Sequence, residues 1–233
     1  MKNNYLGDRL SLVASFVDKE RVADIGCDHG KLLEELFRLK KITYAFASDI
    51  SGPSVNKAVE LLSFNKRNFD YAVGDGLEKL EEKHNIQQVV ISGMGGLEII
   101  KIMENNPLNI NDFVLCPHNN ELTLKLWLVD NNYEIVNDLI VKERHIFYNV
   151  LKVRKSEKRQ KSKLFDLKFG KNNFPSNVDF YNYLIYSKDK YEKLLLNLPK
   201  NKLKDIKKDL KLVNKAIKKW EKCNEKNIAI SKA

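Results

Sequence analysis

The stretch from Val22 to Ser51, VADIGCDHGKLLEELFRLKKITYAFASDIS, has the order strand, turn, helix, strand. One apolar run ends at Asp24, Gly26 and Gly30 bracket a turn, and a second apolar run ends at Asp49. Glycine can adopt positive φ and lets a ligand lie against the backbone. An acidic residue that ends the second strand can accept hydrogen bonds from both hydroxyls of a ribose. The pattern predicts a βαβ unit of a nucleotide-binding sheet, with the ribose on Asp49.

The turn does not match the dinucleotide fingerprint G-x-G-x-x-G, because Asp28 stands where a glycine is required. Asp24 and Asp28 would also repel a pyrophosphate. An acidic floor suits a cationic nucleoside without phosphates, and S-adenosylmethionine carries both an ammonium and a sulfonium group. Taken alone, the segment is equally compatible with an ordinary βα turn of some other α/β protein.

The composition predicts a globular protein. A length of 233 residues allows one domain of about 150 residues and an appendage, and 43% hydrophobic residues are enough for a core. No apolar run approaches the roughly 18 residues that span a bilayer, and MKNNYLGDRL lacks the apolar core of a signal peptide, so we expect a cytoplasmic protein. Cys27, Cys116 and Cys223 form no C-x-x-C pair, so we expect reduced thiols and no metal site.

The net charge of +10 is concentrated in the C-terminal third of the chain. Residues 1–153 contain 18 Lys and Arg against 22 Asp and Glu, whereas residues 154–233 contain 23 against 9. A region this basic attracts polyanions. Binding of its lysines to phosphates would release counterions and favour the complex, so nucleic acid is the expected partner. The alternative is a lysine-rich solvated surface, because Lys and Asn are abundant throughout while Arg is scarce.

Three further strands are predicted at 71–73, 88–91 and 113–115, each followed by a polar or glycine-rich loop. Side chains at the carboxyl ends of parallel strands face the ligand crevice of such a sheet. Asp75, in a tight turn after the first of these strands, is placed to reach an adenine amino group. The alternative for Asp75, and for His29 after the strand at Asp24, is a purely local role.

Two loops are candidates for the pocket of a target base. The loop Ser92-Gly93-Met94-Gly95-Gly96 has three glycines in four residues, which is costly unless its backbone approaches something closely. Its alternative is a tight βα turn. In the loop Cys116-Pro117-His118-Asn119-Asn120, the proline halts the strand and leaves an imidazole and two amides at the same edge of the sheet.

The rest of the chain predicts a closing strand pair and a helical appendage. Residues 133–139 and 144–153 alternate well enough to form an antiparallel pair, which brings the first domain to about seven strands. The lysine-rich segment 154–175 is typical of a connection. Beyond it, two seams at spacings of 3 and 4, joined by about four residues, predict an antiparallel helical hairpin. The expected domains are therefore 1–153, 154–175 and 176–233.

The predicted hairpin is the most basic element of the chain. Its first helix is expected to begin at Ser176, whose hydroxyl would cap it with Asp179 three residues later. The lysines expected on the outside of the second helix and the turn before it are Lys200, Lys202, Lys204, Lys207, Lys208, Lys211, Lys215, Lys218 and Lys219. This surface is the expected site of nucleic-acid binding.

With these parts in place, the sequence resembles the bacterial tRNA (adenine-22-N1)-methyltransferase family, the TrmK family. The motifs that carry the resemblance are ADIGCDHG at 23–30, SDI at 48–50, GDGL at 74–77, SGMGG at 92–96 and LCPHNN at 115–120, with WL at 127–128. The resemblance implies a class I S-adenosylmethionine-dependent methyltransferase of α/β, Rossmann-like fold. The predicted C-terminal coiled-coil hairpin fits the family as well, and its basic charge makes it the element expected to bind tRNA.

The resemblance further implies a set of site residues. The cofactor-binding residues would be Asp24, Gly26, Cys27, Asp28, His29, Asp49, Ile50, Asp75, Gly76, Leu77, Ser92, Gly93 and Met94. The family more often has Ser at Cys27, Glu at Asp49, and Gln-Pro-Asn where this chain has Cys116-Pro117-His118. Either His118 or Asn119 is therefore expected to take the place of that amide at the target base.

The implied reaction transfers a methyl group from S-adenosylmethionine to N1 of an adenosine in the D-arm of tRNA. N1 has an in-plane lone pair, so no base is needed and positioning should dominate catalysis. Because N1 lies on the Watson–Crick edge, the base must be exposed or flipped. Methylation makes the ring cationic, and Asp28 is the candidate carboxylate that stabilises this charge. The alternative for Asp28 is a role in cofactor binding alone.

Three alternatives compete with this function. An NAD-dependent oxidoreductase would need the glycine that Asp28 displaces. An RNA-binding protein without activity on a methyltransferase fold would differ from an enzyme in its affinity for S-adenosylmethionine. A methyltransferase for another RNA position or for a small molecule is the nearest alternative, although the basic hairpin weighs against a small molecule. We expect a monomer that binds no membrane and no metal.

Overall fold

The computed structural model describes residues 6–158, 162–199 and 203–231, with side chains up to residue 225. Its strands are β1 (Arg21–Ile25), β2 (Tyr44–Asp49), β3 (Phe69–Val73), β4 (Gln88–Ser92), β5 (Asp112–Cys116), β6 (Tyr133–Glu143) and β7 (Ile146–Lys155). Within the described residues these seven strands form one sheet in the order β3-β2-β1-β4-β5-β7-β6. Strands β1 to β5 are parallel, and β7 runs antiparallel to both of its neighbours. The predicted Rossmann-like sheet is confirmed.

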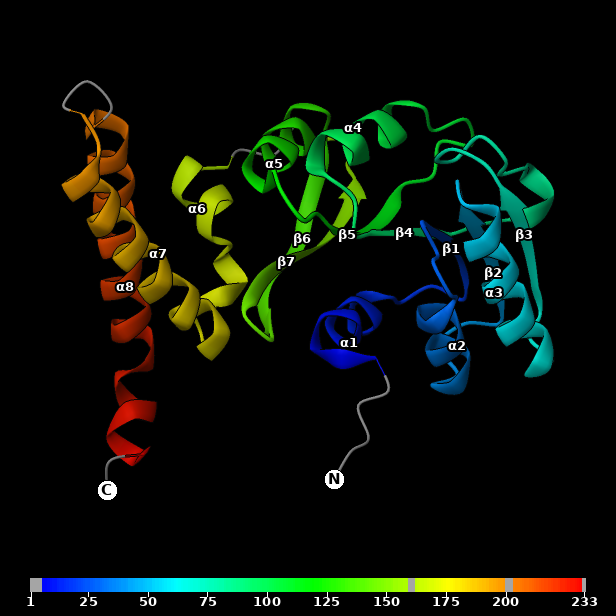
Figure 1. The fold of residues 1–233 in the computed structure, drawn as a ribbon, viewed down its shortest axis with the longest axis horizontal. Helices are drawn as coiled ribbons and strands as arrows, with labels where there is room; N and C mark the ends of the chain where they lie inside the picture. The colour runs from blue at the N-terminus through cyan, green and yellow to red at the C-terminus, as the bar shows by residue number, and fades with distance from the viewer. Residues whose placement is uncertain (1–5, 159–161, 200–202, 232–233) are drawn as a thin grey trace.

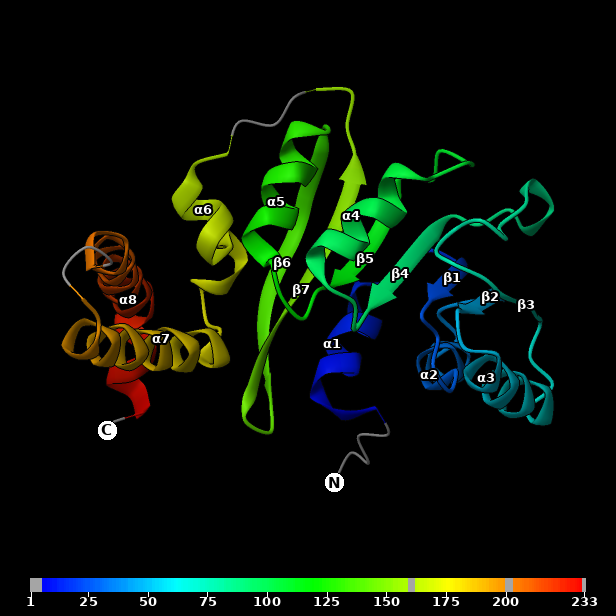
Figure 2. The ribbon, with the colours of Figure 1, turned by 45° about the horizontal axis from the view of Figure 1, so that its top comes forward.

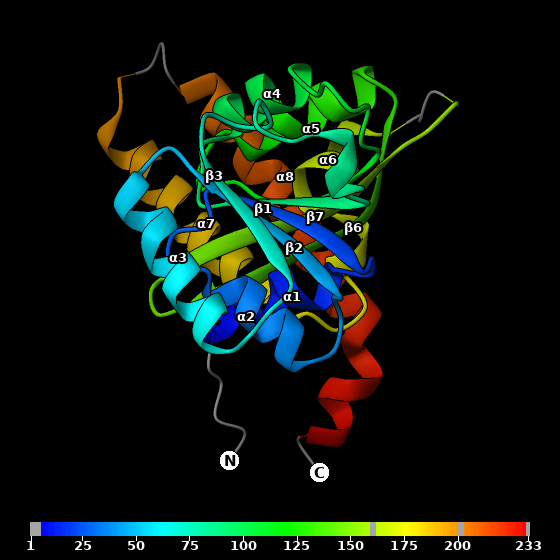
Figure 3. The same cartoon turned by 90° about the vertical axis from the view of Figure 1, so that its right-hand side faces the viewer.

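Helices cover both faces of this sheet (Figures 1 and 3). One face carries α1 (Gly7–Phe16), α2 (Lys31–Arg38) and α3 (Gly52–Phe64), and the other carries α4 (Gly96–Glu104) and α5 (Glu121–Asp130). A short 3₁₀ turn, Glu82–His84, precedes β4. Side chains alternate across the strands, so Ala23 and Ile25 join the core under α4 and α5 while Val22 joins the core under α1 to α3.

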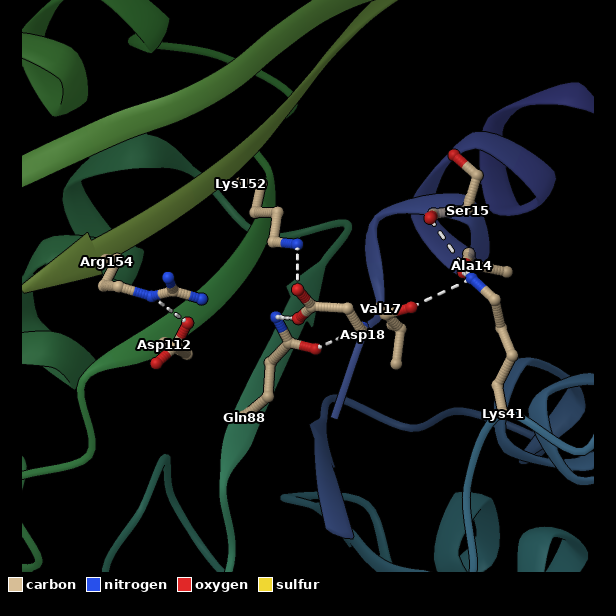
Figure 4. Close-up of polar contacts among 9 residues, drawn as sticks. All are labelled: Ala14, Ser15, Val17, Asp18, Lys41, Gln88, Asp112, Lys152 and Arg154. Atoms are coloured by element: carbon tan, nitrogen blue, oxygen red, sulfur yellow. Dashed lines mark hydrogen bonds and ion pairs between the residues drawn. The ribbon is translucent and has the colours of Figure 1, made fainter. Parts of the chain in front are cut away.

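The C-terminal end of α1 is held by a lysine that follows α2. Lys41 Nζ donates hydrogen bonds to the carbonyl oxygens of Ala14 at 2.6 Å, Ser15 at 3.1 Å and Val17 at 2.9 Å (Figure 4). Carbonyls at a helix end have no partner within the helix, and a cation there opposes the negative end of the helix dipole. Lys41 therefore fixes the position of α1 against the sheet.

Asp18, just after α1, ties the same segment to two strands. Its main-chain N–H donates to Gln88 Oε1 at 3.1 Å, and Lys152 Nζ donates to its carboxylate at 2.5 Å (Figure 4). Burial by itself would raise the pKa of Asp18, but the hydrogen bond and charge of Lys152, with help from Lys19 and Arg154, lower it. The network joins α1, β4 and β7 at the amino-terminal edge of the sheet.

The β6–β7 hairpin is longer than the strands beside it. Leu115, near the end of β5, is paired with Leu151 of β7, so the first residues of β7 and the last residues of β6 extend beyond the carboxyl edge of the sheet. The turn between β6 and β7 lies at Arg144, which has φ of 55°. Figure 2 shows this tip between α1 and α7 (Val178–Asn197).

Helices α7 and α8 (Leu203–Ser231) pack along one another, and Tyr181 stacks on Trp220 with ring centroids 4.4 Å apart. The predicted antiparallel hairpin is confirmed, although its turn at residues 200–202 lies outside the described residues. The predicted cap was wrong. Asn177, and not Ser176, caps α7 by accepting the Phe180 N–H at 3.1 Å, while Asp179 accepts the Lys142 N–H at 2.9 Å.

Residues 154–175 are more than a connection. They contain the end of β7, the helix α6 (Leu164–Phe169) and the 3₁₀ turn Lys171–Asn173. Leu167 and Phe169 are buried with Phe174 and Phe180 in a third apolar cluster, which also contains Ile140 of β6 and Trp220 of α8. The few apolar residues of this segment lie close together in sequence and pack into one cluster. This cluster docks the helical hairpin on the sheet.

Asn173 joins this segment to the edge strand of the sheet. It is fully buried, its Oδ1 accepts the Ile140 N–H at 2.8 Å, and its Nδ2 donates to the Asp138 and Phe169 carbonyls, each at 3.0 Å. Asn177 Nδ2 donates to the Ile140 carbonyl at 2.8 Å. Because an edge strand exposes unpaired backbone groups, these amides satisfy groups that no neighbouring strand reaches. The helical hairpin is therefore a fixed arm.

We predict that Asn173→Ala lowers the free energy of unfolding by about 2–4 kcal/mol, because it leaves a buried N–H and two buried carbonyls without a partner. Asn197→Ala, at the exposed end of α7, is the matched control and should change stability by less than about 0.5 kcal/mol. Chemical denaturation followed by circular dichroism measures both. Equal stabilities of the two variants would contradict this account of how the arm is docked.

Candidate active site

The carboxyl ends of β1 and β4 form the centre of the site. From these two neighbouring strands the chain proceeds outward in opposite directions, toward β3 on one side and β5 on the other. In open α/β sheets such a switch point leaves a crevice at the carboxyl edge. The loops after β1, β2, β4 and β5 meet at this edge, and they carry most of the residues predicted from the sequence.

The carboxylate of Asp49 is held in place by the main chain. Its Oδ2 accepts the Asp28 N–H at 3.1 Å, and its Oδ1 accepts the Ser51 N–H at 2.8 Å. Asp28 itself has φ of 48°, a left-handed conformation that turns its N–H toward Asp49. The Asp28 side chain is 77% exposed and lies 3.3 Å from His29 Nε2. The turn after β1 therefore fixes the acidic end of β2.

Asp24 is the buried acid of the site. Burial, followed by the charge of Asp49, raises the pKa of Asp24 to about 7, while Arg9 opposes this shift and Asp28 adds to it. Arg9 comes from the first turns of α1, and its Nη1 donates to Ser92 Oγ at 2.7 Å. A cavity of about 90 Å³ lies among these groups. Its lining includes Arg9, Asp24, Gly26, Cys27, Asp28, His29 and Ser92.

Cys27 is not a nucleophile in this cavity. Burial raises the pKa of the Cys27 thiol strongly, and the charges of Asp24 and Asp49 raise it further. The thiol is therefore neutral at physiological pH, when only a thiolate would be reactive. All three cysteines are unpaired, with Cys27 and Cys116 buried and Cys223 exposed.

The loop after β4 joins the turn of β1 to the turn of β5. Gly26 has φ of 78°, and a Cβ atom there would lie 2.7 Å from Met94 Cε. The Met94 carbonyl accepts the His118 N–H at 3.0 Å, and His118 Nδ1 lies 3.0 Å from the Gly93 carbonyl. A carbonyl can only accept, so Nδ1 carries a proton. In the corresponding neutral tautomer Nε2 is an acceptor.

A larger groove of about 1140 Å³ lies on the other side of this loop. It runs along α4 and is lined by the turn after β3 and by the loop after β5, including Asp75, Gly76, His118 and Asn119. Asn119 Oδ1 accepts from Asn120 Nδ2 at 2.9 Å, and a Cβ atom at Gly95 would lie 3.0 Å from Asn119 Oδ1. Glycine at this position therefore lets the amide pack against the β4 loop.

The structure divides the predicted site residues between these two spaces. Asp28 borders the small cavity, whereas His118 and Asn119 border the groove, so the three predicted catalytic residues do not line one cavity. Gly93 and Met94 form the loop between the two spaces. Ile50 is 77% exposed beyond β2, and the side chain of Leu77 is buried in the core, so only its main chain can contact a ligand.

Sequence reasoning missed Arg9 and its neighbours on the β6–β7 tip. The Arg9 N–H donates to Glu143 Oε1 at 3.2 Å, and the guanidinium carbon lies 5.3 Å from the centre of the Tyr148 ring. A signal existed, because Arg9 is three residues after Leu6 and four before Val13 on the apolar stripe of the predicted helix. A charge on the buried face of a helix needs a partner.

The described part of the chain contains neither a candidate metal-binding cluster nor a candidate membrane-spanning helix. No cluster of three or more His, Cys, Asp or Glu side chains suited to a metal ion occurs there. None of the helices described is long and apolar enough to cross a bilayer.

Comparison with known proteins identifies the family. A family model described as a methyltransferase domain matches residues 6–151. A putative tRNA methyltransferase of Mycoplasma genitalium is 34% identical over 154 residues, which cover 64% of this chain and 70% of that one. The chain belongs to the TrmK family of methyltransferases. Its cofactor is S-adenosylmethionine, as the acidic turn predicted.

Two other members relate the family to a substrate and to a fold. The tRNA (adenine(22)-N(1))-methyltransferase of Bacillus subtilis is 31% identical over 153 residues, which cover 63% of each chain. The structure of M. capricolum TrmK with S-adenosylhomocysteine superposes with a TM-score of 0.83 at 26% identity, over 93% of this chain and 99% of that one. The likeness to TrmK thus includes the helical arm, beyond the 6–151 match.

We predict that affinity for S-adenosylmethionine rises about tenfold between pH 6 and pH 7.5, because Asp24 has to lose its proton to pair with the ammonium of the cofactor. In the protein without cofactor, loss of the Asp24 proton lowers the free energy of unfolding. The raised pKa means that stability contributed by protonated Asp24 is lost as pH rises from its ordinary pKa through 7. Asp24→Asn should therefore bind weakly with no pH dependence, yet unfold with a higher free energy than wild type at pH 8.

Titration calorimetry over this pH range and denaturation at pH 8 measure the two effects. A wild-type affinity that is flat between pH 6 and pH 7.5 would contradict the assignment of Asp24 to the ammonium.

Proposed function

We propose that the protein transfers a methyl group from S-adenosylmethionine to N1 of adenosine 22 in tRNA. The observation that carries the proposal is the pairing of two spaces. One is a cavity lined by the acidic Asp24 and Asp28, with Asp49 bound to the Asp28 N–H, and the other is the adjoining groove that His118 borders. The first suits a cationic cofactor and the second an adenine. Membership of the TrmK family supports the choice of nucleotide.

The residues present fit the cofactor. Asp49, held by two main-chain N–H groups, would accept both ribose hydroxyls, and Asp24 would pair with the ammonium of the methionine part. Arg9 lies in the same cavity and would pair with the carboxylate of that part. Exposed Ile50 and the Asp75 turn would pack against the adenine and bind its edge. When bound, the cofactor supplies an electrophilic methyl group on a sulfonium.

The groove residues would orient the target base. N1 of adenine attacks through a lone pair that carries no proton, so the protein needs to hold the base in line and exclude water. His118 Nε2 would accept a hydrogen bond from the exocyclic amine of the target adenine. That amine becomes more acidic as the ring gains positive charge, so the bond strengthens toward the transition state. Asn119 would contact the same base from the neighbouring position.

Asp28 keeps two roles in this proposal. Its main chain orients Asp49, and its exposed carboxylate would stabilise the positive charge that develops on the adenine ring. The position of its side chain at the small cavity makes a role in cofactor binding the alternative.

The lysine arm would bind the body of the tRNA. Lys204, Lys207, Lys208, Lys211, Lys215, Lys218 and Lys219 are all exposed on α8, as the sequence predicted, whereas Lys200 and Lys202 lie outside the described residues. Five of these exposed lysines, Lys207, Lys208, Lys211, Lys215 and Lys218, line one shallow groove on this helix. The arm buries its own apolar seam, so we also propose a monomer, and a tRNA substrate places the protein in the cytoplasm.

We predict that the wild-type protein forms 1-methyladenosine in a tRNA transcript and none in the same transcript with guanosine at position 22. His118→Ala should lower kcat about 100-fold with unchanged affinity for S-adenosylmethionine, because it removes a bond made to the reacting base. Mass spectrometry of the nucleosides measures the product, and calorimetry measures cofactor affinity.

The same assays decide the role of Asp28. Asp28→Asn should lower turnover more than cofactor affinity, since the amide keeps the shape and loses the charge. Equal losses of both quantities would make Asp28 a cofactor ligand only, and absence of 1-methyladenosine with wild-type protein would refute the proposed function.

We predict that the triple variant Lys207→Gln, Lys208→Gln and Lys211→Gln weakens tRNA binding and lowers the slope of log K against log salt by about 2, because fewer phosphates are neutralised. Cofactor affinity should not change. The matched control makes the same Lys→Gln changes at the exposed Lys40, Lys66 and Lys83. Lys40 follows α2, Lys66 follows α3 and Lys83 precedes β4, so all three lie at the amino-terminal edge of the sheet. If both triple variants bind tRNA alike at every salt concentration, the lysines of α8 form only a solvated surface.

A further inference from the structure

A second pocket lies between the catalytic domain and the arm. Its volume is about 190 Å³, and its walls come from α5, the β6–β7 hairpin, α6 and α7. The aromatic residues Phe147 and Tyr183 line it together with Leu122, and Tyr148 also borders it. Asn120 borders the large groove and Glu121 borders this pocket, so the first turn of α5 stands between the two spaces.

One residue that lines this pocket has a buried polar atom without a partner among the described residues. Asn149 is 7% exposed, and its Nδ2 donates to Asp138 Oδ1 at 2.6 Å and weakly to the Leu139 carbonyl at 3.4 Å. These two acceptors fix the orientation of the amide. Its Oδ1 makes no hydrogen bond to any described residue. An acceptor buried without a partner is costly, so a donor from a ligand would satisfy it.

The charges around the pocket are already neutralised. Lys125 Nζ lies 2.7 Å from Asp138 Oδ2 with both side chains almost fully buried, and Lys168 pairs with Asp209 of α8. Glu121 adds a negative charge at the wall. A phosphate would find no free cation here, whereas a planar ring with a hydrogen-bond donor would find aromatic faces and an acceptor.

We propose that this pocket takes a second, unpaired nucleobase of the bound tRNA, which stacks on Phe147 or Tyr183 and donates a hydrogen bond to Asn149 Oδ1. The proposal rests on the proposed tRNA methylation and names a further contact with that substrate. A volume of about 190 Å³ has room for one heterocycle and is below the ~300–1,000 Å³ typical of sites for larger ligands.

The location of the pocket indicates what a bound base would do. Phe147 packs edge-on against Tyr183, with ring centroids 5.6 Å apart, so one wall belongs to the catalytic domain and the other to the arm. On the other side of the same strand, Tyr148 carries Arg9 of the cofactor cavity on its ring. A base held here lies between the lysines of α8 and the groove of the target adenine, and it would set the register of the RNA.

The test fills the pocket without removing any of its polar contacts. Leu122→Trp places a ring where the base would stack, and Leu126→Trp, one turn along α5, 41% exposed in the wild type and outside the pocket lining, is the matched control. The substrates are a full tRNA transcript and a set of transcripts with single abasic sites near the target adenosine. KM for tRNA is measured by methyl transfer, and calorimetry with S-adenosylmethionine checks that the cofactor site is intact.

We expect Leu122→Trp to raise KM for tRNA about tenfold, the effect of losing one stacked base, with Leu126→Trp unchanged. One abasic position should raise KM of the wild type by a similar factor and have no further effect on Leu122→Trp, since the two changes remove the same contact. Tyr183→Leu should show the same loss of coupling, so the conclusion does not depend on one variant.

Two results are distinguishable failures. If the wild type methylates tRNA and every abasic transcript loses the same factor with Leu122→Trp as with wild type, the pocket holds no base and the proposal is wrong. If the wild type methylates no tRNA, the proposed function itself fails.

Discussion

The site depends on one electrostatic constraint, the placement of Asp24 and Asp49 at the ends of two neighbouring strands. Burial of Asp24, followed by the charge of Asp49, raises the pKa of Asp24 to about 7. Asp49 is stabilised by the main-chain N–H groups of Asp28 and Ser51, which is why the turn after β1 adopts a left-handed conformation at Asp28. Asp24 has Arg9 as its nearest compensating charge, and a cationic cofactor would complete the compensation.

The position of Arg9 in turn involves a large part of the fold. Its helix is held at one end by Lys41 and the Asp18 network and at the other by Glu143 on the β6–β7 tip. The same two strands carry the arm, because Asn173 and Asn177 bind the open edge of β6. One β-hairpin therefore contacts both the arm and the helix that carries Arg9. Rigid docking also spares the tRNA complex the entropy cost of ordering a loose domain.

Exposed charges and buried polar groups have different roles in this molecule. Ion pairs such as Lys83 with Glu81 are exposed and contribute little to stability. The arm is fixed by amides buried against a strand edge, and lost partners there are costly. Two of the α8 lysines, Lys215 and Lys219, lie over the rings of Phe165 and Phe174. The others, Lys204, Lys207, Lys208, Lys211 and Lys218, are exposed along the helix. Their concentration on the arm is better explained by a polyanionic partner than by folding.

The sequence by itself determined the sheet, the arm and the acidic residues at the carboxyl ends of β1 and β2. Strand periodicity, glycine turns and the acidic ends of β1 and β2 are local properties, so Asp24, Gly26 and Asp49 were predictable. Only the tertiary structure decided which side chains share a cavity. Asp28 and His118 line separate spaces, and Arg9 enters the small cavity from a helix whose role looked purely structural. Asn177, and not Ser176, caps α7, while Asp179 accepts a hydrogen bond from the Lys142 N–H of β6. Contacts between elements distant in sequence leave no period or motif in the chain.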